Sequence, residues 1–523
     1  MNSLDDEDET IYLYRWIVAI AACAGSVMAT MDTFILFVSG PYLRGVFSVS
    51  VSEISWLTTS YATASLVMML LSGYVSRALG NKSAFMLALC TFLTGSLLCA
   101  SANELHTLVM ARIVQGAGAG VMLPVEIVIL RSIFPSRMHP LIMGLYGTTV
   151  MAGPALGPVF GGMIIDNFHW SIIFLINIPI GLLSLGLIYI YLQSERSESS
   201  ASFSKIDWIG IGSLVLGMFT LILLLERGDR TYWFDDSDNR LLLYISAFSL
   251  AFLVAHELTV KSPAIDFSVL RYPVLAPASF LIFTLGFVVS STLFLLPIYM
   301  QEQLDFSPTY AGMAMAPRAI VMALIFPFSG LILNWVKPKH VILTGLTMGL
   351  IASAMMSLFT HDTGWGDTVL PQIILGIGIA LVLTPLNTVA LMYVPKSKLG
   401  AASAFEATCN QLGATLGITI SATMLSYLEK ANWGLLRHNV SLSHTVLYKR
   451  FSGVIEYFHD TTASRFESME KAFRALNGRV TEQILSLSFM YMFQLVAVAF
   501  AIMIVVSILT RLTPPLLQNK PQR

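Results

Sequence analysis

Fourteen long apolar segments constrain the fold of this chain more than any other feature of its sequence. An α-helix needs about 20 mostly apolar residues to cross the hydrocarbon core of a bilayer. Within lipid, backbone polar groups must be satisfied inside the segment, which favours helices. The sequence therefore predicts an all-α polytopic membrane protein, with spans at about 16–38, 54–76, 83–102, 105–129, 141–164, 171–192, 207–225, 241–259, 275–299, 311–335, 341–360, 369–393, 401–428 and 484–510.

The composition supports this prediction and excludes several other classes of protein. The chain has 523 residues, of which 55% are hydrophobic and 12% charged, whereas soluble domains are about 25% charged. Its net charge is −1 and it has no basic tract, so we do not expect nucleic-acid binding. It contains no P-loop pattern, no HExxH and no CxxC spacing. We therefore expect no metal, no bound cofactor and no enzymatic activity.

The distribution of Lys and Arg predicts the orientation of the spans. If the acidic N-terminus lies inside, sixteen Lys and Arg residues flank the inner ends of the spans and four lie in the short outer loops. Positively charged short loops stay in the cytoplasm. We therefore expect both terminal tails, 1–15 and 511–523, to be cytoplasmic, and the long loop 429–481 to lie outside.

The chain also repeats itself weakly. The segment 73–82 recurs as 330–339 at an offset of 257, and 115–118 aligns with 375–378 at an offset of 260. Internal repeats of this kind characterise secondary transporters, whose substrate site lies between the two halves. The repeat predicts two parallel six-helix bundles, at 16–192 and 273–510, with two inserted helices and their linkers at 193–272.

Several motifs lie on these predicted helices. Span five reads GPALGPVFGG over 153–162, span four reads LVMARIVQG over 108–116, and span one carries Asp32 between Met31 and Thr33. These motifs resemble those of the major facilitator superfamily, in particular its fourteen-helix drug:proton antiporter branch. The residues that match the antiporter signature of that branch are Gly153, Pro154, Gly157, Pro158, Gly161 and Gly162.

The resemblance implies a function. It implies a proton-coupled antiporter that exports amphipathic drugs or toxic small molecules across a bacterial cytoplasmic membrane by alternating access, with the proton as coupling ion. Some members of the branch with a long outer loop work with a periplasmic adaptor and an outer-membrane channel, so the loop 429–481 is a candidate docking surface or a simple lid. The alternatives are a dedicated exporter of one siderophore, fatty acid or peptide-like compound, and a membrane sensor that transports nothing.

Asp32 and Arg112 are the first candidate site residues. An acid within a span is costly to insert, which makes it a functional-site candidate. At 1.5 Å per residue, Asp32 lies about 24 Å along span one and Arg112 about 10 Å below the outer face, so their heights are similar. We predict Asp32 as the proton carrier and Arg112 as the cation that tunes it. The alternative is a static buried salt bridge.

The other candidates carry weaker signals. Glu126 and Glu406 lie near the inner side and Arg318 near the outer side, as possible proton or substrate sites. Glu126 is alternatively a partner of Arg131 at the membrane edge, and Arg318 alternatively caps a carbonyl. The loop after span two resembles the gating loop of the family, although Arg77 stands where the family usually has an acid. The residues of this loop are Gly73, Arg77, Gly80 and Lys82.

The antiporter signature has a mechanical explanation. Gly153, Gly157 and Gly161 share one helix face, and small residues allow a neighbouring helix to approach closely. Pro154 and Pro158 each remove a backbone donor and favour a kink. The pattern therefore predicts a thin, bent helix at the seam between the halves, although ordinary tight packing gives the same pattern.

Overall fold

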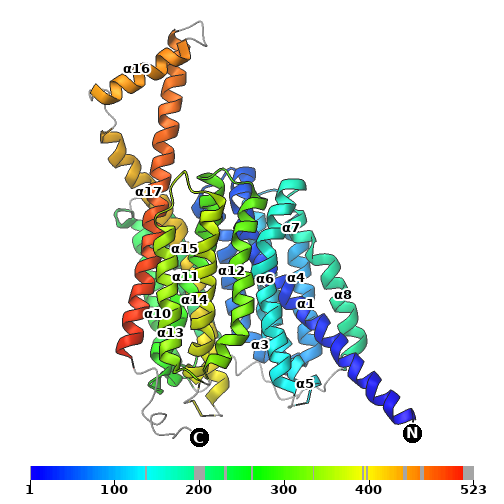
Figure 1. Cartoon of the computed structure of the whole chain (residues 1–523). Helices are drawn as coiled ribbons and strands as arrows, with labels where there is room; N and C mark the ends of the chain where they lie inside the picture. The colour runs from blue at the N-terminus through cyan, green and yellow to red at the C-terminus, as the bar shows by residue number, and fades with distance from the viewer. Residues whose placement is uncertain are drawn as a thin grey trace.

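A computed structural model describes most of the chain. It covers residues 2–135, 138–193, 207–228, 233–260, 263–333, 335–391, 394–395, 398–439, 445–459 and 465–510. All regular elements within these residues are helices (Figure 1), which confirms the predicted all-α membrane fold. Twelve helices of the described part are long and apolar enough to cross a membrane.

The helices follow one another with short connections. Those of the first half are α1 (Asn2–Phe47), α2 (Val51–Ile54), α3 (Trp56–Leu79), α4 (Asn81–Ala100), α5 (Leu105–Ile133), α6 (His139–Asn167), α7 (Ile172–Leu175) and α8 (Asn177–Tyr191). The inserted segment contributes α9 (Trp208–Gly228), η3 (Trp233–Asp235), α10 (Ser237–Glu257) and η4 (Phe267–Arg271). The second half has α11 (Leu275–Glu302), α12 (Pro308–Ile332), α13 (Pro338–Met356), α14 (Trp365–Leu391), α15 (Leu399–Asn439), α16 (Thr445–His459) and α17 (Arg465–Leu509).

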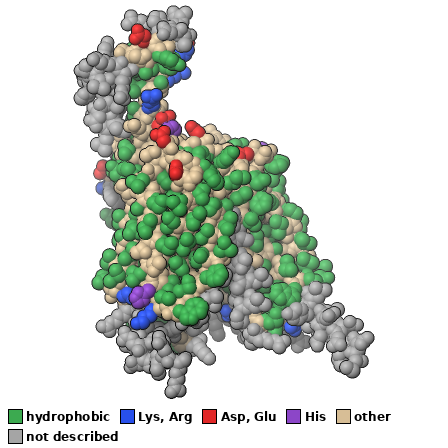
Figure 2. Space-filling view, in the orientation of Figure 1, with side chains coloured by type: hydrophobic (Ala, Val, Ile, Leu, Met, Phe, Trp, Pro, Cys, Tyr) green, Lys and Arg blue, Asp and Glu red, His purple; other side chains and the backbone are tan. Residues whose placement is uncertain are grey.

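The two ends of the bundle differ in shape. α1 begins and α17 ends at the same end, which we call the terminal face (Figure 1). At the opposite end, the hairpin face, α15 and α17 continue beyond the bundle and α16 lies between them. Figure 2 shows hydrophobic side chains over the flank between the two faces, and acidic side chains gathered at the hairpin face. An apolar flank of this kind suits contact with lipid.

The helices pack as two similar groups. In the first half α5 packs between α3 and α4, and α1 packs on α6 and α8; in the second half α14 packs between α12 and α13, and α11 packs on α15 and α17. The halves meet where α6 packs on α12, α3 on α15 and α1 on α11. α9 and α10 pair with each other. The exact residue boundaries of the two bundles stay predictions.

The repeated segments make the same kind of contact in both halves. Lys82 donates a hydrogen bond to the carbonyl of Tyr189 at the end of α8, at 2.8 Å. Lys339 donates to the carbonyl of Ile508 at the end of α17, also at 2.8 Å. The last carbonyls of a helix lack intrahelical partners, and a nearby ammonium group satisfies them. Two lysines that lie 257 residues apart thus tie equivalent helices together.

Candidate functional site

A central cavity lies between the two halves. Its volume is about 360 Å³, within the usual size of small-molecule sites. Its wall is formed by α1, α3, α5 and α6 on one side and by α11, α12, α14 and α15 on the other. Most lining residues are apolar, and Asn410 and Gln411 are the two with amide side chains. Among the described lining residues, Arg318 is the only charged one.

Asp32 lies at the centre of a buried polar network beside this cavity. It forms an ion pair with Arg112, and both side chains are almost fully buried. One carboxylate oxygen, Oδ1, also accepts hydrogen bonds from Gln115 Nε2 at 2.8 Å and from Asn177 Nδ2 at 3.0 Å. Arg112 Nε donates to the carbonyl of Leu57 at 3.0 Å. The network therefore joins α1 to α3, α5 and α8 through a single carboxylate and its partner.

The structure brings together the two residues that the sequence places at similar height, but their role in proton coupling stays a prediction. Gln115 and Asn177 were not among the predicted site residues. The sequence feature that could have identified them is a polar amide within an apolar span. Gln115 also follows Arg112 by about one helical turn. Buried polar groups almost always need partners. Such amides are therefore worth testing as companions of an intramembrane acid.

Tyr61 lies between the network and the cavity. Its ring lies under the guanidinium of Arg112, with the Cζ atom 4.1 Å from the ring centroid. Its hydroxyl donates to the carbonyl of Ala29 at 3.2 Å. Tyr61 lines the cavity, whereas Asp32 and Arg112 are not among its described lining residues. The aromatic ring therefore separates the ion pair from the cavity in this conformation.

The antiporter signature packs against the turns of α1 that carry Asp32. A methyl group on Gly153 would collide with Thr30, and one on Gly157 would lie 2.6 Å from Phe34 Cβ. On Gly161 it would lie 3.0 Å from the carbonyl oxygen of Ile35. α6 and α1 are therefore in backbone contact above and below the buried carboxylate.

The other face of α6 packs against the second half. A methyl group on Gly162 would lie 2.6 Å from Thr309 Cα, and one on Gly312 would lie 2.7 Å from the carbonyl carbon of Pro158. The side chain of Pro154 lies outside the described residues. α6 is thus a thin helix between α1 and α12, in direct contact with both.

Glu126 is fully buried on α5 and accepts a hydrogen bond from Ser26 of α1. Its second carboxylate oxygen has no hydrogen-bond partner among the described residues. Arg131, the alternative partner considered from the sequence, is exposed. Glu126 is therefore a buried acid on the helix pair α1–α5, apart from the Asp32 network.

Glu406 and Arg318 lie in the second half. Glu406 is buried on α15, and its Oε1 atom has no hydrogen-bond partner in the described part of the chain. Arg318 lies in the wall of the cavity and donates from Nη1 to Thr292 Oγ1 at 3.1 Å. Glu126 and Glu406 are not among the described lining residues. Of these three candidates, Arg318 is the one placed to contact a molecule in the cavity.

The predicted gating loop is a tight connection between α3 and α4. Gly80 has φ 79° and ψ 155°, and its positive φ suits glycine. Lys82 points to the end of α8, while Gly73 is exposed with open space around it. The side chain of Arg77 lies outside the described residues, so its predicted role stays untested.

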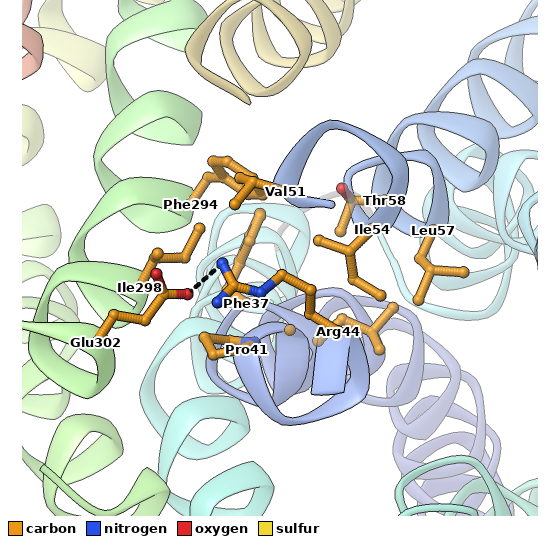
Figure 3. Close-up of a pocket in the computed structure, with 12 residues that line it drawn as sticks. Phe37, Pro41, Arg44, Val51, Ile54, Leu57, Thr58, Phe294, Ile298 and Glu302 are labelled. Atoms are coloured by element: carbon orange, nitrogen blue, oxygen red, sulfur yellow. Dashed lines mark ion pairs between the residues drawn. The ribbon is translucent and has the colours of Figure 1, made fainter. Parts of the chain in front are cut away.

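Contacts between the halves close the cavity toward the hairpin face. Arg44 of α1 and Glu302 of α11 form an ion pair at 2.6 Å beside a small pocket of about 20 Å³ (Figure 3). One residue earlier on α11, Gln301 Nε2 donates to the carbonyl of Val38 at 2.7 Å. The backbone N–H of Thr309 donates to Asp166 at 3.0 Å, which joins α12 to α6.

Two packed halves around a central cavity define a membrane transporter, and comparisons with known proteins identify its family. The family model described as Major Facilitator Superfamily matches residues 22–418. The chain belongs to the major facilitator superfamily.

The relatives place the chain more narrowly. It is similar to the probable multidrug resistance protein EmrY of Escherichia coli K12, with 28% identity over 94% of both chains. It is also 28% identical to the multidrug export protein EmrB of the same organism, over 81% of this chain and 83% of EmrB. The resemblance to the drug:proton antiporter branch is confirmed.

A solved structure supports the fold. A POT family transporter in complex with a thioalcohol-conjugated peptide superposes with a TM-score of 0.64 at 13% identity, covering 95% of this chain and 96% of that chain. At this identity the match shows the fold alone.

Proposed function

We propose that this protein is a proton-coupled antiporter that exports amphipathic drugs or toxic small molecules by alternating access. The observation that carries the proposal is the buried pair of Asp32 and Arg112 next to a mostly apolar cavity. An acid inside a membrane protein, paired with a cation and close to the substrate cavity, is suited to coupling a proton to transport. Such a protein is an integral membrane protein that works in a lipid bilayer on small molecules.

Protonation of Asp32 provides the mechanical step. The neutral carboxyl no longer holds Arg112 by charge, and Arg112 keeps the neutral partners Gln115 and Leu57. The connection from α1 to α5 and α8 is then weaker. Thr30 and Thr33 of the same helix line the cavity. Proton and substrate therefore bias the position of one helix, and each shifts the equilibrium by its differential affinity for the two states.

The proton gradient is large enough to drive this step. One elementary charge that crosses 100 mV yields about 2.3 kcal/mol. A tenfold concentration ratio corresponds to about 1.4 kcal/mol. At about 150 mV, one proton therefore supports a gradient of a few hundred-fold for a neutral substrate. Neither ATP nor a cofactor is needed.

Glu126 and Glu406 are the alternative proton sites. Both are buried, and each has a carboxylate oxygen without a hydrogen-bond partner in the described part of the chain. Acids inside membrane spans are typical members of proton relays, so either group can exchange a proton when water reaches it. Asp32 is the preferred candidate because it pairs with Arg112, whose guanidinium lies on Tyr61, a residue of the cavity wall.

We place the protein in a bacterial cytoplasmic membrane, with the terminal face toward the cytoplasm. Sixteen Lys and Arg residues flank the ends of the spans on the terminal side, whereas four lie in the short loops on the opposite side, and this difference supports the orientation. The hairpin formed by α16 and the projecting ends of α15 and α17 then lies outside. Its exposed side chains include Tyr457, Met469 and Phe473, and we propose this surface as the docking site of a periplasmic adaptor protein with an outer-membrane channel.

Substrate-induced proton release tests the function. Lipophilic cations and anions are added to the purified protein in weakly buffered detergent solution, and the released protons are measured for the wild type and for Asp32→Asn. Release by several unrelated compounds that is lost in the variant supports the proposal. Release that persists moves the proton site to Glu126 or Glu406. A response to one compound alone favours a dedicated exporter, and no proton release with any compound favours a dedicated exporter whose substrate is outside the panel.

A further inference from the structure

The guanidinium of Arg318 is a buried cation without an anionic partner among the residues that the structure describes. The residue is 3% exposed, and its side chain lines the cavity. Its recorded hydrogen bond runs from Nη1 to the hydroxyl of Thr292 at 3.1 Å. Nη2 has no hydrogen-bond partner in the described part of the chain. The wall of the cavity offers no carboxylate among its described residues.

The two halves differ in the surroundings of a buried arginine. In the first half Arg112 has a carboxylate partner, Asp32. In the second half Arg318 donates to a hydroxyl group, that of Thr292. The second half therefore keeps a buried positive charge with no neutralising carboxylate among the described residues of the cavity wall.

A buried charge that lacks a partner is costly, and the cost falls when a counter-ion arrives. The guanidinium carries five N–H donors in a planar fork that matches a carboxylate in a bidentate arrangement. The rest of the cavity has apolar walls, including Phe34, Phe37, Met315 and Met322. The cavity thus combines one cation with adaptable apolar surface.

We propose that Arg318 binds the anionic group of amphipathic substrates, and that carboxylate-bearing amphiphiles are the preferred substrate class of this cavity. The proposal rests on the proposed transport function. The carboxylate pairs with the unpartnered side of the guanidinium, and the alkyl or aromatic body lies against the apolar wall. Arg318 is then the residue that determines substrate charge, apart from the proton site at Asp32.

The test compares two ligands of the same chain length and opposite charge. Binding of decanoate and of decyltrimethylammonium is measured by isothermal titration to the protein in nanodiscs, for the wild type and for Arg318→Gln. We expect at least about a tenfold loss of affinity for decanoate, since hydrogen bonds to charged groups are among the stronger ones. Affinity for the cation should stay the same or rise. Ser290→Ala, another change in the cavity wall, should leave the ratio of the two affinities unchanged.

Equal decanoate affinity in the wild type and in a folded Arg318→Gln variant overturns the proposal. If that variant does not fold, Arg318→Lys keeps the charge but removes the planar fork. A loss restricted to decanoate then supports the proposal, and an equal loss for both ligands overturns it.

Proton-driven uptake into proteoliposomes separates this proposal from the proposed function. Uptake of the cation by the wild type, together with decanoate binding that does not depend on Arg318, leaves the antiporter function intact and removes the anion site. Arg318-dependent binding without proton-driven uptake of either ligand keeps the anion site and removes the antiporter function.

Discussion

At the scale of residues, the buried arginines Arg112 and Arg318 have opposite surroundings. Arg112 is neutralised by Asp32 and held by Gln115 and by the carbonyl of Leu57. Arg318 has a hydroxyl partner. Buried ion pairs contribute little net stability, but the loss of one partner is costly. We therefore expect the first arginine to respond to the protonation state of Asp32, and the second to the charge of a ligand.

This view predicts the stability of single and double variants at the ion pair. Asp32→Asn leaves the charge of Arg112 buried without its counter-ion, which should cost about 3–5 kcal/mol of unfolding free energy. Adding Arg112→Gln removes the stranded charge and should recover most of the loss. Melting temperatures in one detergent check both expectations. A double variant less stable than Asp32→Asn alone would contradict the assigned pairing.

The sequence predicts the height of a side chain in the membrane better than it predicts which side chains surround it. A helix rises by a fixed distance per residue, so the similar heights of Asp32 and Arg112 follow from the limits of their spans. Tyr61, Gln115 and Asn177 complete the network in the structure. Their contacts depend on which helices are neighbours and on how each is rotated about its axis. Tertiary packing determines both properties, and no local pattern encodes them.

At the scale of elements, α6 is a helix that touches both the turns of α1 around Asp32 and the wall of the cavity. Gly153, Gly157 and Gly161 face α1, while Pro158 and Gly162 face α12. α12 carries Gly312 at this contact and Arg318 less than two turns later. A movement of α1 would therefore reach the wall of the cavity through a single helix.

Gly312→Ala tests the seam between α6 and α12. Its methyl group would meet the backbone of Pro158, which cannot move aside as a side chain can. Overpacking of this kind costs about 1–3 kcal/mol. We expect a lower melting temperature and slower transport at an unchanged proton site. The matched control is Gly186→Ala on α8, where no atom lies within 4 Å. Normal transport and stability in Gly312→Ala would show that close contact between α6 and α12 is not needed for transport.

At the terminal face, we expect the stability of an ion pair between η4 and the start of α15 to depend on pH. Asp266 lies just before η4, and its carboxylate pairs with Lys398 before α15 at 2.8 Å. Burial alone would raise the pKa of Asp266, but hydrogen bonds from Lys398 and Ser268 outweigh it and hold the pKa below its ordinary value of 3.8. The pair therefore stabilises the fold at pH values above 3.8, and this contribution disappears as the pH falls through the lowered pKa.

The expected result is a difference in melting temperature between the wild type and Asp266→Asn at pH 7 that shrinks as the pH falls below 3.8. The difference at pH 7 should be small, because Lys398 is about half exposed and solvent screens the pair. A difference that grows toward acid pH would contradict the assignment.

Hydropathy predicts where the helices lie but not where each helix ends. Each of the fourteen predicted spans overlaps a long helix of the structure, although several run a few residues past its end, as 241–259 does beyond Glu257 and 341–360 beyond Met356. α1 nevertheless begins at Asn2, within the predicted N-terminal tail, and α15 and α17 extend far into the predicted outer loop 429–481. Hydropathy marks where a helix lies in lipid, but a helix ends where its capping and packing end. Within the same loop, α16 covers Thr445–His459, where Tyr448, Phe451 and Phe458 recur at helical spacing.

At the scale of the whole molecule, the structure is a transporter closed toward the hairpin face. Arg44–Glu302 and Gln301–Val38 join α1 to α11 there. Alternating access requires that these contacts break when the cavity opens on that side. A partly exposed ion pair contributes about 0.2–1 kcal/mol, which corresponds to a population shift of at most about fivefold. The pair is thus strong enough to bias the equilibrium without locking it.

Arg44→Gln should therefore increase access to the cavity from the hairpin side. The probe is Ser290→Cys in the cavity wall, in a background that lacks Cys23, Cys90, Cys99 and Cys409. We expect its labelling by a membrane-impermeant thiol reagent to be about two- to fivefold faster with Arg44→Gln. The control is Lys471→Gln, which removes an ion pair within α17 and should have no effect. Unchanged labelling with Arg44→Gln would show that the pair does not contribute to closure.

The central claim is that Asp32 couples the proton to transport, and the most direct measurement compares two modes of transport in proteoliposomes. Substrate exchange without a gradient needs only binding and alternating access, whereas uphill accumulation driven by a pH gradient also needs the proton carrier. The account predicts that Asp32→Asn with Arg112→Gln retains exchange and loses accumulation. Accumulation at the wild-type level in this variant would contradict the claim.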